Sequence, residues 1–217
     1  MEYPKDLVKL TKARSKNYNL EGFVTGQGPL RPKLMIVGEA PGRKEIENFI
    51  PFSGQAGKEL MTCLASVGLT RKDVYITSAV RSRPYATKER INKKTDKKEI
   101  IYPNRTPLKK EILAHAPLLD YEIKKVKPKI IAPVGNIGLQ RLLGNNYVVS
   151  QTHGQIIHHP IQKLNEKMTD YIWSDSNYTI VPLFHPAAIF YNRQLESLIK
   201  KDWQILGELL QLTADKS

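Results

Sequence analysis

The chain has 217 residues and carries 34 Lys and Arg against 21 Asp and Glu, a formal net charge of +13 at pH 7. That length suits one large α/β domain or two small ones, and a core of that size needs neither a disulfide nor a metal for stability. The single cysteine, Cys63, excludes a disulfide framework and a thiolate metal site within one chain, and it favours a reducing, cytoplasmic location.

The first 16 residues are charged throughout and lack the apolar core of a signal peptide, and no run of about 18 apolar residues occurs in the sequence. We therefore expect a protein that is neither exported nor bound to a membrane. The excess of positive charge favours a polyanion as partner, because each Lys or Arg placed on a phosphate releases a condensed counterion. The segment 87–111 holds nine basic and four acidic side chains. A solvated loop would explain any single one of these lysines equally well.

Short apolar runs, typical of buried strands, alternate with segments of helical apolar spacing. In chain order we expect a strand at 33–37, a helix at 55–67, a strand at 73–77, a helix at 107–126, a strand at 129–134, a helix at 136–143, a strand at 178–184 and a helix at 197–212. Strands separated by helices indicate βαβ units. The predicted fold is therefore an α/β/α sandwich of three layers around a mostly parallel, four-stranded sheet.

A short motif follows each expected strand. These motifs are GEAPG, TSAVRSRP, VGN and FHPAA, in chain order. Because ligands of open α/β sheets bind at the carboxyl ends of the strands, we expect all four motifs to line one crevice. GEAPG is neither a P-loop nor a dinucleotide fingerprint, and its Pro41 lacks the backbone donor that a phosphate cradle would use.

Each motif taken singly also has a structural explanation. GEAPG can be a turn that leaves Glu39 exposed, Phe52 can fill the core, and His185 can cap a loop. The ordered combination is more specific. The series GEAPG, PFSGQAG, DVYITSAVRSRP, NRTPLKKEI, KPKIIAPVGNIGLQRLLG, THGQ and VPLFHPAA resembles the uracil-DNA glycosylase superfamily, and within it family 4.

The resemblance covers about residues 33–190. It implies the uracil-DNA glycosylase fold, in a single domain over residues 1–217 with a charged insertion at about 85–106. The implied activity is that of a DNA repair hydrolase, which flips uracil or another deaminated base out of DNA and hydrolyses its N-glycosidic bond. None of the motifs has a lysine at a position suited to catalyse a lyase step, so we expect a monofunctional glycosylase. The expected partner is DNA containing such a base, bound by a monomer.

The resemblance also assigns roles within the crevice. The catalytic residues would be Glu39, Glu45 and His185. His185 would donate a hydrogen bond to the base as negative charge develops, and the two carboxylates would act on the water or organise the turn. Phe52 would supply the face on which the base stacks. The base-binding residues would be Gly38, Ala40, Phe52 and Ser78.

DNA outside the crevice would be held by basic side chains and by the segment after the His-Pro pair. Apolar residues at that segment would enter the minor groove as a wedge. The expected DNA-binding residues are Arg81, Arg83, Pro186, Ala187 and Arg193, together with the segment 87–111.

The sequence departs from family 4 in two respects. Members of that family carry four cysteines that hold a [4Fe-4S] cluster, whereas here Ser82 stands at one of these places and His115 or a neighbour at another, so we expect no cluster and no metal. The asparagine that reads the uracil edge is replaced by Ser78, whose hydroxyl cannot give the two-point contact of an amide. Weak uracil excision, a wider range of bases such as hypoxanthine or xanthine, and a relative that binds DNA or a damaged base without cleavage are the alternatives.

Overall fold

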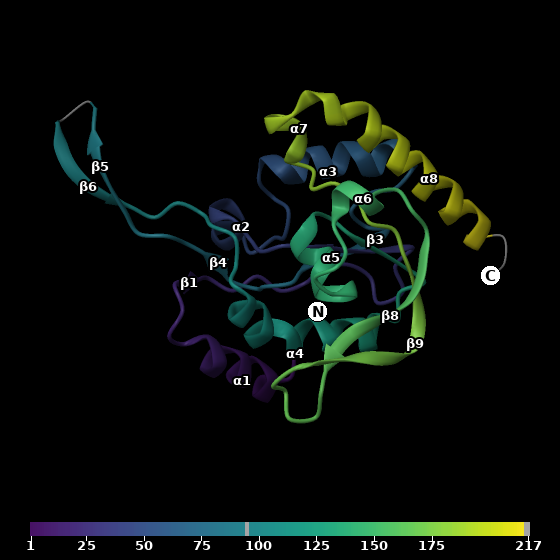
Figure 1. The fold of residues 1–217 in the computed structure, drawn as a ribbon, viewed down its shortest axis with the longest axis horizontal. Coiled ribbons are helices and arrows are strands. Elements are labelled where there is room, and N and C mark those ends of the chain that lie inside the picture. The colour runs from purple at the N-terminus through teal and green to yellow at the C-terminus, as the bar shows by residue number, and fades with distance from the viewer. Residues whose placement is uncertain (94–95, 215–217) are drawn as a thin grey trace.

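The computed structural model describes residues 1–93 and 96–214, and its centre is a five-stranded sheet (Figure 1). The strands are β2 Leu34–Gly38, β3 Val74–Ser78, β7 Ile130–Pro133, β8 Ile157–Leu164 and β9 Tyr171–Ile180, in the spatial order β3-β2-β7-β9-β8. β8 is antiparallel to β9, and the other neighbours are parallel. The predicted α/β fold with a mostly parallel sheet is confirmed, but the expectation of four strands is wrong, because an antiparallel edge strand is added.

Helices cover both faces of this sheet. The α-helices are α1 Lys5–Ser15, α2 Arg43–Asn48, α3 Gln55–Ser66, α4 Lys109–Val126, α5 Asn136–Leu143, α6 Val149–Thr152, α7 Ala188–Tyr191 and α8 Glu196–Ala214, with a 3-10 turn at Arg193–Leu195. Successive side chains of a strand point to opposite faces. Ile36 of β2 accordingly lies in one core with α3 and α8, and Val37 lies in a second core with α4 and α5. In the described part of the chain, none of the helices is long and apolar enough to span a membrane.

Two small sheets lie beside the central one. β1 Leu20–Glu21 pairs with β4 Arg83–Pro84, and β5 Lys88–Asn92 pairs with β6 Lys97–Ile101, both in antiparallel fashion. The charged insertion expected at 85–106 therefore contains a β-hairpin. This hairpin projects away from the body of the protein (Figure 1).

Candidate active site

The loops after β2, β3 and β9 surround a cavity of about 370 Å³ at the carboxyl edge of the sheet. A backbone hydrogen bond of 2.9 Å from Ala79 N–H to the Gly38 carbonyl joins the loops after β3 and β2, and one of 2.9 Å from Gly135 N–H to the Leu183 carbonyl joins the loop after β7 to the loop after β9. The volume lies within the range of small-molecule sites. Residues that line the cavity include Ala40, Glu45, Phe52, Ser78, Asn104 and His185.

Phe52 forms one wall of this cavity from a tight turn. Its φ of 53° is left-handed, a region that bulky residues rarely adopt. Two hydrogen bonds hold the turn, from Arg71 to the carbonyl oxygens of Pro51 (2.6 Å) and Phe52 (2.9 Å). The ring lies against Gly38, where a Cβ atom would come within 2.7 Å of Cε2. Glycine at the end of β2 is therefore required for the position of the ring.

Glu45 joins the two turns that border the cavity. Its Oε2 accepts a hydrogen bond from Gly42 N–H and its Oε1 accepts one from Gly54 N–H, each at 3.1 Å. Gly42 and Gly54 are the N-cap residues of α2 and α3, so one carboxylate lies at the amino ends of two helices, where negative charge is stabilising. The GEAPG and PFSG turns are thereby held together by this side chain.

The ring of His185 lies next to that of Phe52 in the cavity lining, with centroids 5.9 Å apart and a tilt of 33°. Its Nδ1 accepts a hydrogen bond from Ala187 N–H at 3.2 Å. Burial lowers the pKa of His185, and the carboxylate of Glu45 opposes this shift in part. A neutral ring whose Nδ1 is an acceptor carries its proton on Nε2. The imidazole is thus prepared to donate a hydrogen bond from Nε2.

The THGQ motif lies behind His185. The ring of His153 packs on Phe184, the residue before His185, with centroids 4.5 Å apart. Nδ1 of His153 lies 2.9 Å from both carboxylate oxygens of Asp202, a buried residue of α8. Burial raises the pKa of Asp202, and His153 opposes that shift. The pair connects α8 to the strand end that presents His185.

Ser78 is buried at the end of β3 and lines the cavity. Its hydroxyl donates a hydrogen bond of 2.8 Å to the Val80 carbonyl. A hydroxyl has one proton and two lone pairs, so Ser78 can offer only an acceptor to a ligand while this bond is kept.

Gly38 and Glu39 do not line the cavity. Gly38 lies behind the Phe52 ring, as described above. The carboxylate of Glu39 is half-buried and accepts a hydrogen bond from the Thr106 hydroxyl. Burial raises the pKa of Glu39, and the Thr106 bond opposes that shift. Glu39 therefore connects the end of β2 to the NRTP segment.

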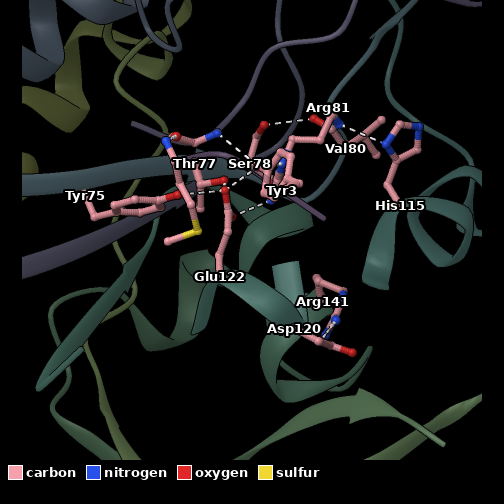
Figure 2. A network of polar contacts seen from close by, with 12 residues as sticks. Tyr3, Tyr75, Thr77, Ser78, Val80, Arg81, His115, Asp120, Glu122 and Arg141 are labelled. Carbon is pink, nitrogen blue, oxygen red and sulfur yellow. Dashed lines mark hydrogen bonds and ion pairs between the residues drawn. The ribbon is translucent and has the colours of Figure 1, made fainter. Parts of the chain in front are cut away.

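The prediction that Arg81 contacts DNA is wrong, because the side chain is completely buried. Figure 2 shows it in a network around Glu122 of α4, which accepts from Arg81 Nη2 at 2.5 Å and from Thr77 Oγ1 at 2.7 Å. Tyr3 and Tyr75 donate to the other oxygen of the same carboxylate, at 2.5 and 2.9 Å. Arg81 also donates to the carbonyl of Ser78 and so fixes the backbone at the end of β3 from within the protein core.

Arg83 is buried as well, so its expected contact with phosphate is also wrong. It pairs with Glu21, donates to the Tyr102 carbonyl and donates to Asn104 Oδ1 at 2.5 Å. Because Asn104 lines the cavity, Arg83 helps to fix the position of a side chain in the cavity wall.

The segment after His185 differs in detail from the expected wedge. Pro186 is buried, so its predicted groove contact is wrong for this conformation, and Ala187 is half-buried. The exposed apolar side chains come later, at Phe190 (43% exposed) and Tyr191 (90% exposed) of α7. Arg193 is exposed.

The residues at the implied cluster positions do not fit a [4Fe-4S] cluster, which is held by thiolates. His115 is buried, and its Nδ1 accepts a hydrogen bond from Arg81 N–H at 3.2 Å. Burial and the charge of Arg81 lower the pKa of His115 to about 3, so the ring is neutral. Ser82 supplies a hydroxyl, and Cys63 lies in α3 against the sheet core. Within the described residues, no group of three or more His, Cys, Asp or Glu could hold a metal ion.

Sequence reasoning missed several residues that form or support the cavity. Asn104 belongs to the quoted NRTPLKKEI motif, and this motif was the signal that could have identified it. Arg71 and Glu122 carry no local signal, because they act on partners that lie far from them in sequence.

A family model and several curated relatives carry the name of one family. The family model described as "Uracil DNA glycosylase superfamily" matches residues 25–207. The Type-4 uracil-DNA glycosylase of Sulfurisphaera tokodaii is 31% identical over 192 residues, which are 86% of this chain and 74% of that protein. The Type-4 uracil-DNA glycosylase of Thermotoga maritima is 29% identical over 197 residues, 90% of this chain and 86% of that protein. A protein of Bacillus phage SP01 named DNA polymerase is 28% identical over 187 residues, which are 86% of this chain and 17% of that protein.

Proposed function

The chain belongs to the uracil-DNA glycosylase superfamily, and from this membership we propose that it is a monofunctional DNA glycosylase that excises uracil or another deaminated base from DNA. The observation that carries the proposal is the cavity lined by the neighbouring rings of Phe52 and His185, with the His185 proton directed to Nε2 by Ala187 N–H. A base removed from the helical stack needs an aromatic face and a hydrogen-bond donor in such a cavity.

In this proposal the flipped base stacks on Phe52 and the bond between C1′ of the sugar and the base nitrogen breaks. Its electron pair moves into the base, and the sugar gains oxocarbenium character. His185 Nε2–H donates to a base carbonyl oxygen on which negative charge develops, and this interaction strengthens as the bond lengthens. Water then adds to C1′ and loses a proton, while the departing base gains one.

Glu45 has a structural part and an electrostatic part in this reaction. Its carboxylate already accepts two backbone hydrogen bonds, and about two further lone-pair sites are left for a water molecule. A negative charge on the cavity wall also stabilises the cationic sugar. Glu39, hydrogen-bonded to Thr106 outside the cavity lining, supports the turn rather than the water.

Ser78 can distinguish a deaminated base from cytosine or adenine through one atom. Uracil, hypoxanthine and xanthine all carry an N–H group on the Watson–Crick edge, whereas cytosine and adenine present a bare nitrogen acceptor there. A hydroxyl oxygen whose proton is donated to Val80 can accept from the N–H group but would repel the bare nitrogen. This contact would distinguish a deaminated base from cytosine and adenine without requiring uracil alone. Thymine and guanine carry the same N–H group, so in this proposal the shape of the cavity has to exclude them.

The test uses duplex oligonucleotides that carry uracil, hypoxanthine, xanthine or only normal bases, followed by alkali to cleave abasic sites. We expect cleavage of at least one deaminated substrate and none of the normal duplex. His185→Ala should lower the single-turnover rate by about 10²- to 10³-fold, the usual effect of removing one preorganised donor. His158→Ala, on the exposed surface of β8, is the matched control and should not change the rate. If no substrate yields an abasic site, the enzyme proposal fails and binding without cleavage becomes the better account.

A further inference from the structure

The proposed chemistry does not use the hairpin of β5 and β6. We call these strands, residues 88–92 and 97–101, the arm. They form a two-stranded sheet of their own and project from the body of the protein (Figure 1). The arm lies between β4 and Asn104 in the chain, so it begins and ends beside the cavity.

The root of the arm is fixed to the residues that shape the cavity. Ala86 N–H donates to the Pro103 carbonyl at 2.9 Å and closes the two chains at the root. Buried Arg83 donates both to the Tyr102 carbonyl and to Asn104 Oδ1. Because one guanidinium binds the end of the arm and a residue of the cavity wall, the direction of the arm is set relative to the cavity.

The arm presents basic and apolar side chains that the fold does not need. The cross-strand register places Ile91 opposite Lys98, and Ile100 follows on the same face. These isoleucines are 59% and 58% exposed. Lys88 and Lys97 belong to the opposite, also exposed face. Isoleucines exposed on a projecting ribbon mark a surface that contacts a partner.

The charge of the arm indicates what kind of partner this is. Its acidic Glu99 is paired with Arg90 at 2.5 Å and also accepts from Asn92 at 3.0 Å. Apart from this pair, the two strands carry three lysines, Lys88, Lys97 and Lys98, against one carboxylate, Glu89. On the isoleucine face Glu89 offsets Lys98, so the surplus positive charge lies on the opposite face. It comes from both strands, Lys88 from β5 and Lys97 from β6, which suits two rows of phosphates on either side of the ribbon.

From these contacts we infer that the arm docks in the major groove of the duplex beside the flipped nucleotide, an inference that rests on the proposed action on DNA at the cavity. The major groove, about 12 Å wide, admits a two-stranded β-ribbon, whereas the minor groove is about 6 Å wide. Strands of this length extend over about 17 Å. Ile91 and Ile100 face base edges such as the thymine methyl group. Lys88 and Lys97, on the opposite face, extend their long side chains past the two edges of the ribbon to the phosphates on either side.

The first test measures binding to a duplex that contains no damaged base, so that it does not depend on excision. The variant Lys88→Gln/Lys97→Gln/Lys98→Gln should reduce the slope of log K against log salt by up to about 3, one for each lost phosphate contact. The control Arg31→Gln/Lys124→Gln/Lys127→Gln removes the same charge from exposed positions at the opposite edge of the sheet and should leave the slope unchanged. An unchanged slope in the arm variant, or an equal fall in the control, would overturn the inference.

The second test identifies the groove. Dimethyl sulfate methylates guanine N7, an atom of the major groove. The protein should protect guanines on one side of a central lesion, and Ile91→Ser/Ile100→Ser should abolish that protection without changing the salt slope. Absence of protection in the unaltered protein contradicts docking in the major groove. The inference also fails if the isoleucine variant converts a dimer to a monomer in sedimentation while its DNA binding is unchanged, because the arm would then bind a second copy. Since neither readout requires cleavage, failure of the arm and failure of the proposed excision are distinguishable.

Discussion

Ser78 differs from an amide side chain in one measurable respect, since its single proton is already donated to Val80. An asparagine at this position would bring both a donor and an acceptor to the cavity. The identity of residue 78 therefore determines whether the site reads one atom or two atoms of a base edge.

We expect Ser78→Asn to raise the single-turnover rate of uracil excision by about three- to tenfold, because it adds one hydrogen bond worth about 1 kcal/mol. Ser78→Ala is the matched control; it removes the acceptor and should slow the excision of every deaminated base. Rates measured side by side on uracil and hypoxanthine duplexes check this. An unchanged or slower uracil rate in Ser78→Asn would mean that residue 78 does not contact the base.

Individual charged residues were the least predictable part of the site. The positions of Phe52 and His185 followed from their motifs, and the structure brings both to the cavity. Arg81 and Arg83 follow the same strand, yet both are buried. Their partners Glu122, Tyr3 and Glu21 lie 41 to 78 residues away in sequence. The sequence shows that a residue is charged but not whether it is paired with a distant residue. The prediction that these two side chains are exposed was therefore wrong.

At the scale of elements, prediction depended on apolar content. β2, β3 and β7 are buried runs without polar interruption and were predicted within one or two residues. β8 was missed because its residues, IHHPIQKL, are mostly half-exposed and mixed in polarity. The arm was predicted as a charged loop for the same reason: β5 has almost no buried face, so no apolar alternation marks it as a strand.

α7 is the element whose surface has the clearest consequence for binding. Tyr191 is 90% exposed and lies six residues after His185. We expect Tyr191→Ala to slow excision from duplex DNA by about tenfold or more, because an aromatic wedge offsets the few kcal/mol needed to unstack a base. Excision from a single strand, where the base is already unstacked, should change little. Trp173→Ala, an exposed aromatic of β9, is the control; an equal loss on both substrates in Tyr191→Ala would contradict the wedge role.

At the scale of the whole molecule, a buried polar network joins the N-terminal segment, the central sheet and α4. Tyr3, Tyr75, Thr77 and Arg81 all converge on Glu122 (Figure 2). His115 lies at its end and binds Arg81 N–H through an unprotonated nitrogen. A neutral, buried histidine in this position makes the stability of the fold depend on pH.

The direction of that dependence follows from the pKa. His115 has a folded pKa of about 3 against an ordinary value of 6.5, so the unfolded chain takes up the proton first as the pH falls. The contribution of neutral His115 to the free energy of unfolding is complete above about pH 6.5. It falls by about 1.4 kcal/mol per pH unit as the pH is lowered toward 3. In His115→Asn, whose side-chain oxygen can still accept from Arg81 N–H, this loss should be absent.

Urea unfolding at pH 7, 5.5 and 4.5 checks the prediction. The free energy of unfolding should fall more steeply in the unaltered protein than in His115→Asn, so that the two values converge or cross in acid. His158→Asn, an exposed substitution, should keep the steeper slope. Parallel curves for the unaltered protein and His115→Asn would show that His115 does not titrate in this window.

The left-handed backbone of Phe52 has a consequence for selection. A bulky residue at a φ of 53° costs about 1–3 kcal/mol relative to a relaxed conformation, and glycine or asparagine would remove much of that cost. A library of variants selected only for heat resistance should therefore replace Phe52, whereas a library selected for excision should keep it. Selection for stability and selection for activity therefore favour different residues at position 52. In relatives that are no longer selected for base excision, the aromatic residue at this position should be replaced early.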